Sequence, residues 1–131
     1  MALRGRTILV LEEEYLIALE ISRILEEANV GTIEVVRNIE ELAAKEPEFG
    51  RFDAAIVEIK TFGESVVPAA RRIAEAGIPI VFGTAFEEYM DGVPGFPDAP
   101  VVLKPYAADQ FVAAVLSAIA RRSKPLHGEL A

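Results

Sequence analysis

A regular alternation between short, mainly apolar runs and longer segments of helical spacing constrains this chain more than any other feature. The apolar runs lie at residues 7–11, 32–36, 54–59, 78–83 and 100–103. The segments of helical spacing lie at residues 14–28, 38–44, 65–76 and 107–121. Such runs are typical of strands covered on both faces, and their alternation with helices implies right-handed crossovers. The pattern predicts an α/β fold with a doubly wound, five-stranded parallel sheet.

The segment at 86–100 breaks this alternation. It contains three prolines and two glycines where a fourth helix is expected between the last two strands. Each proline lacks a backbone N–H and disfavours helical geometry in the residue before it. We therefore predict that this helix is reduced or absent, with at most one turn at 86–91.

For two of the predicted helices, the sequence indicates which face is buried. The buried stripe predicted for 14–28 comprises Leu16, Ile17, Ile21, Ile24, Leu25 and Ala28. Its end is predicted at Asn29 and Gly31. The buried stripe predicted for 107–121 comprises Phe111, Val112, Val115, Leu116 and Ile119. The other side of that helix is predicted to carry Ala107, Ala108, Ala113, Ala114, Ala118 and Ala120, a smooth face that suits a protein partner or a homodimer.

Length and charge limit what kind of protein this is. The 131 residues, 52% of them hydrophobic, suffice for one domain, predicted at 1–122 with a flexible tail at 123–131. A formal charge of −8 argues against nucleic acid as a partner, and the absence of cysteine excludes disulfides and thiol chemistry. No apolar run approaches the roughly 20 residues that span a membrane. We therefore expect a cytoplasmic protein without a membrane partner.

Polar residues end or follow four of the predicted strands. Glu12 and Glu13 follow the first strand, and Glu58 lies near the end of the third. Thr84 and Lys104 follow the fourth and fifth strands. Sites in doubly wound sheets form at the carboxyl ends of the strands, so these side chains are expected to meet at one edge. The carboxylate of Glu58 is costly to bury and needs a counter-charge there.

These residues, in this order, resemble a known family. The stretches ILVLEEE, DAAIVEI, IVFGTA and VLKPY are similar to the strand ends of response regulator receiver domains (CheY-like) over residues 6–121. The resemblance implies a flavodoxin-like sheet with strand order 2-1-3-4-5. The stretch FGTAF and the broken segment after it resemble an alphaproteobacterial single-domain subgroup, the FATGUY type, with a PFxFATGY-like motif.

The resemblance also implies a role for each polar residue. Glu12 and Glu13 take the place of the acidic pair that holds Mg²⁺, and Glu58 takes the place of the phosphoacceptor aspartate. Thr84 and Lys104 correspond to the residues that bind the phosphoryl oxygens. Pro105 follows the lysine in a bond that is expected to be cis.

The departures from the family pattern indicate that the response to phosphorylation is changed. Glu58 is one methylene longer than the family's aspartate, and an error near ~1 Å in positioning can cost ~10²-fold in phosphoryl transfer. Two glutamates in the acidic pair crowd the Mg²⁺ position, which predicts weakened metal affinity. Val101 stands where many receivers have an aromatic residue. We therefore expect Glu58 to form an ion pair with Lys104 and the phosphorylation switch to be weakened or lost.

Three classes of function follow from the sequence. The first is a stand-alone receiver, not an enzyme, that contacts a histidine kinase, a phosphotransfer protein or a downstream regulator. The second keeps the phosphorelay, with Glu58 or a neighbour accepting the phosphoryl group and Mg²⁺ at Glu12 and Glu13. The third is an unrelated enzyme on the same fold. The third is disfavoured because the strand ends lack both a phosphate cradle and an Asp-x-Asp motif.

Overall fold

Five parallel strands form a single sheet in the order β2-β1-β3-β4-β5, which confirms the predicted topology. The structure, a computed structural model, describes residues 3–60 and 66–123. The strands are β1 (Thr7–Leu11), β2 (Thr32–Val36), β3 (Ala54–Ile59), β4 (Ile80–Thr84) and β5 (Val101–Leu103). The α-helices are α1 (Tyr15–Glu27), α2 (Ile39–Lys45), α3 (Val67–Glu75) and α4 (Ala108–Ser123), with short 3-10 turns η1 (Glu46–Arg51) and η2 (Glu87–Tyr89).

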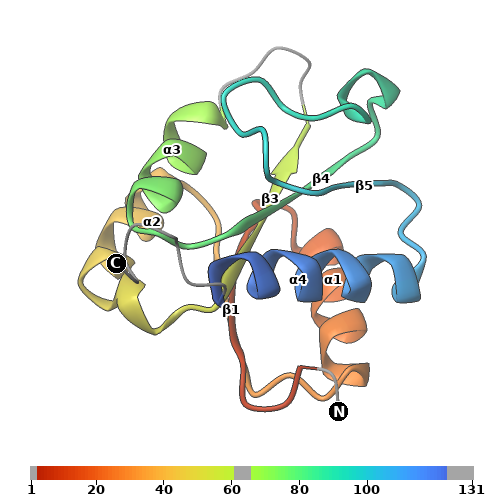
Figure 1. The fold of residues 1–131 in the computed structure, drawn as a ribbon. Coiled ribbons are helices and arrows are strands. Elements are labelled where there is room, and N and C mark those ends of the chain that lie inside the picture. The colour runs from red at the N-terminus through yellow and green to blue at the C-terminus, as the bar shows by residue number, and fades with distance from the viewer. Residues whose placement is uncertain (1–2, 61–65, 124–131) are drawn as a thin grey trace, which may run out of the picture.

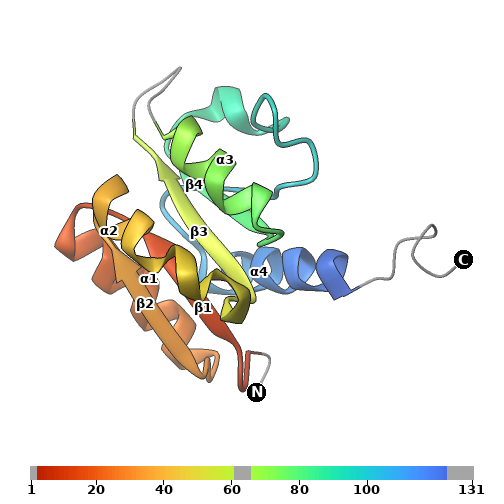
Figure 2. The same ribbon diagram turned by 90° about the vertical axis from the view of Figure 1, so that its left-hand side faces the viewer.

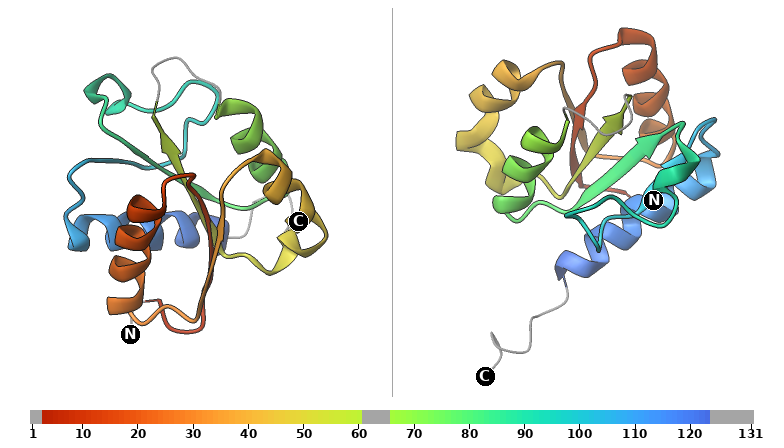
Figure 3. Two further views of the ribbon diagram at one scale, coloured as in Figure 1. Left: turned by 180° about the vertical axis from the view of Figure 1, so that it is seen from behind. Right: turned by 90° about the horizontal axis from the view of Figure 1, so that it is seen from above.

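The sheet is covered by helices on both faces. Helices α1 and α4 lie on one face, and α2 and α3 lie on the other (Figures 1 and 3). The first face packs a core around Ile21 and Phe111, and the second packs a core around Phe52 and Ile73. The central strand β3 is buried along its whole length, so any polar side chain on it needs a partner.

Local signals explain where several helices begin and end. Asn38 caps α2, because its side-chain oxygen accepts a hydrogen bond from the backbone N–H of Glu41 at 2.8 Å. Asn29, at a φ of 66°, lies in the left-handed region just after α1, as the sequence predicts. Gly77, at a φ of 83°, does the same after α3. The predicted start of α3 at Ser65 lies outside the described residues.

The segment between β4 and β5 has only the short turn η2 in place of a helix, which confirms the prediction for 86–100 (Figure 2). It is anchored to the second face of the sheet through the ring of Phe96. The guanidinium of Arg71, on α3, lies 5.0 Å from the centre of that ring. Phe96 also packs edge-on against Phe82, on β4, with ring centres 5.2 Å apart.

Three predictions about helix faces are wrong, and one of them concerns Ala114, which was predicted to face outward but is half-buried against the core of the first face. Leu16 is 75% exposed, although it was predicted to be buried. At 3.6 residues per turn it points away from Ala18, Ile21 and Leu25, which are the buried residues of α1. Ala118 is buried rather than outward-facing, because it lies two turns after Phe111 on the same side of α4.

Two other expectations are only partly covered by the structure. The tail predicted at 123–131 lies, apart from Ser123 at the end of α4, outside the described residues. No helix in the described parts of the chain combines the length and apolar character needed to cross a membrane.

The two leucines of α1 offer a matched test of this packing. Leu25→Ala empties a fully buried position and should lower the free energy of unfolding by about 2–5 kcal/mol. Leu16→Ala makes the same chemical change at an exposed position and should alter it by no more than about 0.5 kcal/mol. Urea unfolding followed by circular dichroism measures both. Equal losses in the two variants would contradict the placement of α1.

Candidate functional site

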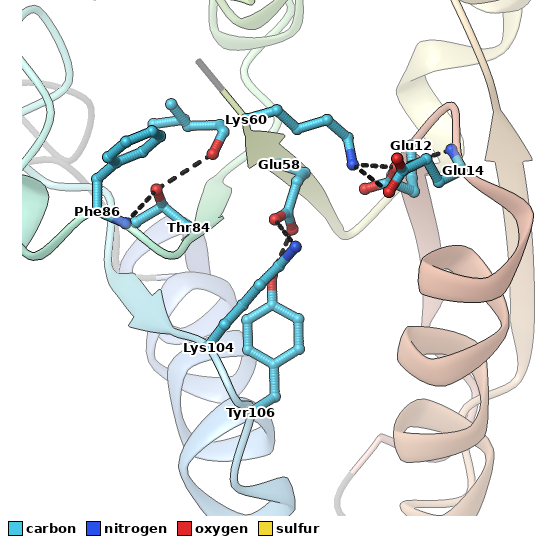
Figure 4. A network of polar contacts seen from close by, with 9 residues as sticks. Glu12, Glu14, Glu58, Lys60, Thr84, Phe86, Lys104 and Tyr106 are labelled. Atoms are coloured by element: carbon cyan, nitrogen blue, oxygen red, sulfur yellow. Dashed lines mark hydrogen bonds and ion pairs between the residues drawn. The ribbon is translucent and has the colours of Figure 1, made fainter. Parts of the chain in front are cut away.

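The carboxyl ends of β1, β3, β4 and β5 bring the predicted polar residues to one edge of the sheet. Strand pairing sets Glu58 of β3 directly beside Gly83 of β4, and Ile59 beside Thr84. Figure 4 shows the resulting network, in which three groups of contacts lie near the end of β3. Two of them are centred on the carboxylates of Glu58 and Glu12, and the third on the hydroxyl of Thr84.

Glu58 is a buried carboxylate with one oxygen in an ion pair and the other in a hydrogen bond, and the ion-paired oxygen has no hydrogen-bond partner among the described residues. The side chain is 2% exposed. Its Oε2 lies 2.5 Å from Nζ of Lys104, and its Oε1 accepts a hydrogen bond from the hydroxyl of Tyr106. The ion pair expected between Glu58 and Lys104 is therefore present. An ammonium and a phenol together compensate the charge that burial makes costly.

Tyr106 is a member of this site that the sequence reasoning missed. Its ring packs edge-on against Phe111 of α4, with ring centres 5.0 Å apart, and this directs its hydroxyl towards β3. Burial raises the pKa of Tyr106, and the negative charge of Glu58 raises it further. The phenol therefore stays protonated and donates its hydrogen to the carboxylate.

Gly83 provides the space for this contact. A Cβ at position 83 would lie 2.1 Å from the hydroxyl oxygen of Tyr106 and 3.0 Å from Oε1 of Glu58. No side chain larger than hydrogen fits there while the tyrosine keeps its place. A glycine inside a strand often marks such a close approach, and this was the signal in the sequence that could have revealed Tyr106.

Glu12 forms the second group, together with another residue that the sequence reasoning missed. Its Oε2 accepts the backbone N–H of Glu14 at 2.8 Å and lies 2.8 Å from Nζ of Lys60. The same ammonium lies 3.1 Å from Oε1 of Glu14. Burial lowers the pKa of Lys60, but its contacts with Glu12 and Glu14 outweigh that effect, so the pKa lies above its ordinary value.

The other predicted residues lie at the same edge with different contacts. Thr84 is fully buried, but its hydroxyl donates to the carbonyl of Ile59 at 3.1 Å and accepts the backbone N–H of Phe86 at 3.0 Å. The structure therefore does not direct this hydroxyl at Glu58. Glu13 is exposed, and Pro105 follows the predicted cis bond.

A cavity of about 410 Å³ opens beside these groups, with Glu12, Glu13, Glu58, Lys60 and Arg37 among the residues that line it. The Mg²⁺ implied by the resemblance needs several oxygen ligands at about 2.0–2.1 Å in octahedral geometry. Within residues 3–60 and 66–123, no three carboxylate or histidine side chains are grouped so as to hold a metal ion. Lysines already neutralise Glu12 and Glu58. With Lys60 and Lys104 paired in this way, the residues at this edge do not fit a divalent cation.

Tyr106→Phe tests the contact between phenol and carboxylate. It removes a donor from a buried oxygen and should lower the free energy of unfolding by about 1–3 kcal/mol near neutral pH. Because the pKa of Tyr106 is raised in the folded protein, the unfolded tyrosine ionises first, above about pH 10. This stabilisation is therefore constant below that pH and falls by about 1.4 kcal/mol per pH unit above it.

Urea unfolding of the native and variant proteins from about pH 7 to about pH 11 measures this effect. A stability difference that stays constant over the whole range would contradict the raised pKa.

Comparison with solved structures relates the whole chain to proteins of known fold. A response regulator receiver protein from Sinorhizobium medicae WSM419 is 21% identical, with a TM-score of 0.73 over 90% of this chain and 97% of that chain. The response regulator PhyR from Brucella abortus is 25% identical, with a TM-score of 0.67 over 92% of this chain. The match spans only 50% of the PhyR chain. No protein-family model matches the chain, and neither does any curated protein sequence.

A more similar sequence belongs to SdrG from Sphingomonas melonis Fr1, which is 34% identical. The match has a TM-score of 0.65 and covers 88% of this chain and 98% of SdrG. SdrG has also been solved in a conformation activated by beryllofluoride. With this identity over nearly the whole of both chains, and with the same sheet order, the chain belongs to the receiver domains of response regulators.

Proposed function

We propose that this receiver acts in two-component signalling by protein contact and that its phosphorylation switch is weakened or lost. The observation that carries the proposal is the state of Glu58. Both oxygens of this carboxylate are held, one by Lys104 and the other by Tyr106. The residue occupies the position at which the family resemblance puts the phosphoacceptor aspartate.

Phosphoryl transfer depends on positioning and on cations that are free to receive the developing charge. A nucleophilic oxygen of Glu58 would first have to leave either an ammonium or a phenol. Lys104, which would bind the phosphoryl oxygens, is itself paired with the nucleophile at 2.5 Å. The hydroxyl of Thr84 is bonded to the backbone of β3. Each of these contacts opposes the transfer of a phosphoryl group to Glu58.

The same contact gives the domain a fixed state that resembles an activated one. In a phosphorylated receiver the lysine contacts the phosphoryl group, and here the longer carboxylate of Glu58 reaches that lysine directly. The partner in this proposal is a histidine kinase, a phosphotransfer protein or a downstream regulator. Four exposed alanines, Ala107 just before α4 and Ala108, Ala113 and Ala120 on it, offer small side chains for contact with such a protein or with a second copy of the chain.

A second candidate function is a receiver that remains phosphorylatable, with Glu58 or a neighbouring acid as the acceptor and Mg²⁺ as the cofactor. The observation that favours it is the beryllofluoride-activated conformation of SdrG, a relative that is 34% identical. Beryllofluoride binding by this chain separates the two candidates.

The decisive experiment is a titration of the ¹⁵N-labelled protein with Mg²⁺ and then beryllofluoride, followed by NMR. The native protein should show no shifts at the amides of Glu12, Glu58 and Lys104, because the carboxylate is already held. Glu58→Asp, which restores the family's shorter acceptor, should respond at high Mg²⁺ concentration. Shifts in the native protein would overturn the proposal and support the phosphorylatable receiver.

Gly83→Ala tests whether the tyrosine keeps Glu58 in place. The added methyl group would lie 2.1 Å from the hydroxyl oxygen, so the ring has to leave and the carboxylate loses its donor. The free energy of unfolding should fall by about 1–3 kcal/mol. Gly50→Ala is the matched control, because nothing lies within 4 Å of the Cβ it would add. An unchanged stability in Gly83→Ala, measured by urea unfolding, would show that the contact contributes nothing.

A further inference from the structure

The ammonium of Lys60 lies at the edge of the sheet, between the end of β3 and the glutamates that follow β1. Lys60 follows β3, and its side chain extends across the edge of the sheet towards β1 (Figure 4). Its Nζ contacts two carboxylates, Glu12 at 2.8 Å and Glu14 at 3.1 Å. The lysine side chain is 27% exposed and that of Glu12 is fully buried, so this ion pair is only partly screened by solvent.

Glu12 needs a cation at this place. One of its oxygens, Oε2, also accepts the backbone N–H of Glu14, whereas Oε1 is buried and has no hydrogen-bond partner among the described residues. A buried carboxylate with a single backbone donor and no counter-charge is strongly disfavoured. Lys60 supplies the cation that the backbone alone does not.

A divalent ion at Glu12 would compete with this ammonium. It would have to approach to about 2.1 Å from a carboxylate oxygen. The two cations would then share one carboxylate and repel each other at a distance where their charges are poorly screened. Glu58, which would be the next ligand, is held by Lys104 and Tyr106 on the far side of the site. Binding of a metal ion therefore requires Lys60 to leave.

We propose that Lys60 is the resident cation of this pocket, a tethered ammonium that takes the place of a divalent metal ion at Glu12. Folding of the domain then requires no divalent cation. A metal ion can bind at Glu12 only when the lysine is absent, and this is the latent metal site of the proposal. This inference concerns the charge at Glu12 alone. It holds whether or not Glu58 is ever phosphorylated.

Lys60→Met tests the proposal, because it keeps most of the apolar length of the side chain and removes the charge. Mg²⁺ and Mn²⁺ are titrated separately into the ¹⁵N-labelled native and variant proteins, with no phosphoryl analogue present. The variant should bind both ions at least about tenfold more tightly than the native protein, with effects centred on the amides of Glu12 and Glu13. Adding Glu12→Gln to the variant should abolish the gain.

Lys45→Met is the matched control. Lys45 forms an ion pair with Glu34 at 2.6 Å, and neither residue lines the cavity. The control makes the same change in net charge, so it should leave metal binding as weak as in the native protein. A gain in Lys45→Met equal to that in Lys60→Met would overturn the proposal, as would equal affinities of the native protein and Lys60→Met.

Loss of Lys60 also leaves Glu12 buried without a counter-charge, so the stability of the variant is informative. The thermal midpoint of Lys60→Met should rise on addition of Mg²⁺ or Mn²⁺, whereas that of the native protein should not change. A variant that unfolds and is not rescued by either ion would show that no metal can replace the lysine, and would refute the latent site. These results are read without beryllofluoride, so they are separate from the test of the proposed function.

Discussion

The burial of a carboxylate at the end of a fully covered strand is the constraint on which the functional edge of this domain depends. Strand β3 is buried at every residue, and Glu58 is its one charged member. A charge in such a place is tolerated only with good partners. Lys104 and Tyr106 both come from the connection between β5 and α4, so the charge of one side chain ties this connection to β3.

Each of the two buried carboxylates in the pocket is paired with its own lysine. Between β3 and β5, Glu58 is paired with Lys104, and between β1 and β3, Glu12 is paired with Lys60. A signalling pocket that must accept both a divalent ion and a phosphoryl group needs uncompensated charge of each sign. In this receiver the chain itself supplies the compensation. The fold of the family is kept, and each of the two buried carboxylates has a lysine beside it.

The sequence predicted the fold well because strands and helices leave periodic patterns that depend on neighbours in the chain. The cap at Asn38 and the missing helix between β4 and β5 follow from such local signals. The sheet order was implied instead by the resemblance to receiver domains. Leu16 was misassigned because hydrophobicity alone does not say which of two adjacent apolar residues faces the sheet. The role of Lys60 depends on how far a long side chain reaches between strands, and no local pattern records that reach. The role of Tyr106 left one indirect signal, the glycine at position 83 inside β4.

Gly83 and Tyr106 lie far apart in the sequence, but the position of the tyrosine depends on the glycine. The space above its backbone is occupied by the hydroxyl of Tyr106, so the absence of one methyl group is part of the structure of the site. Among related receivers, a glycine before the threonine and a tyrosine after Lys-Pro should therefore occur together. A lineage that acquires alanine at the first position gives up the phenol at the second. The two residues are then expected to change together, so the history of this pocket could be traced in sequences alone.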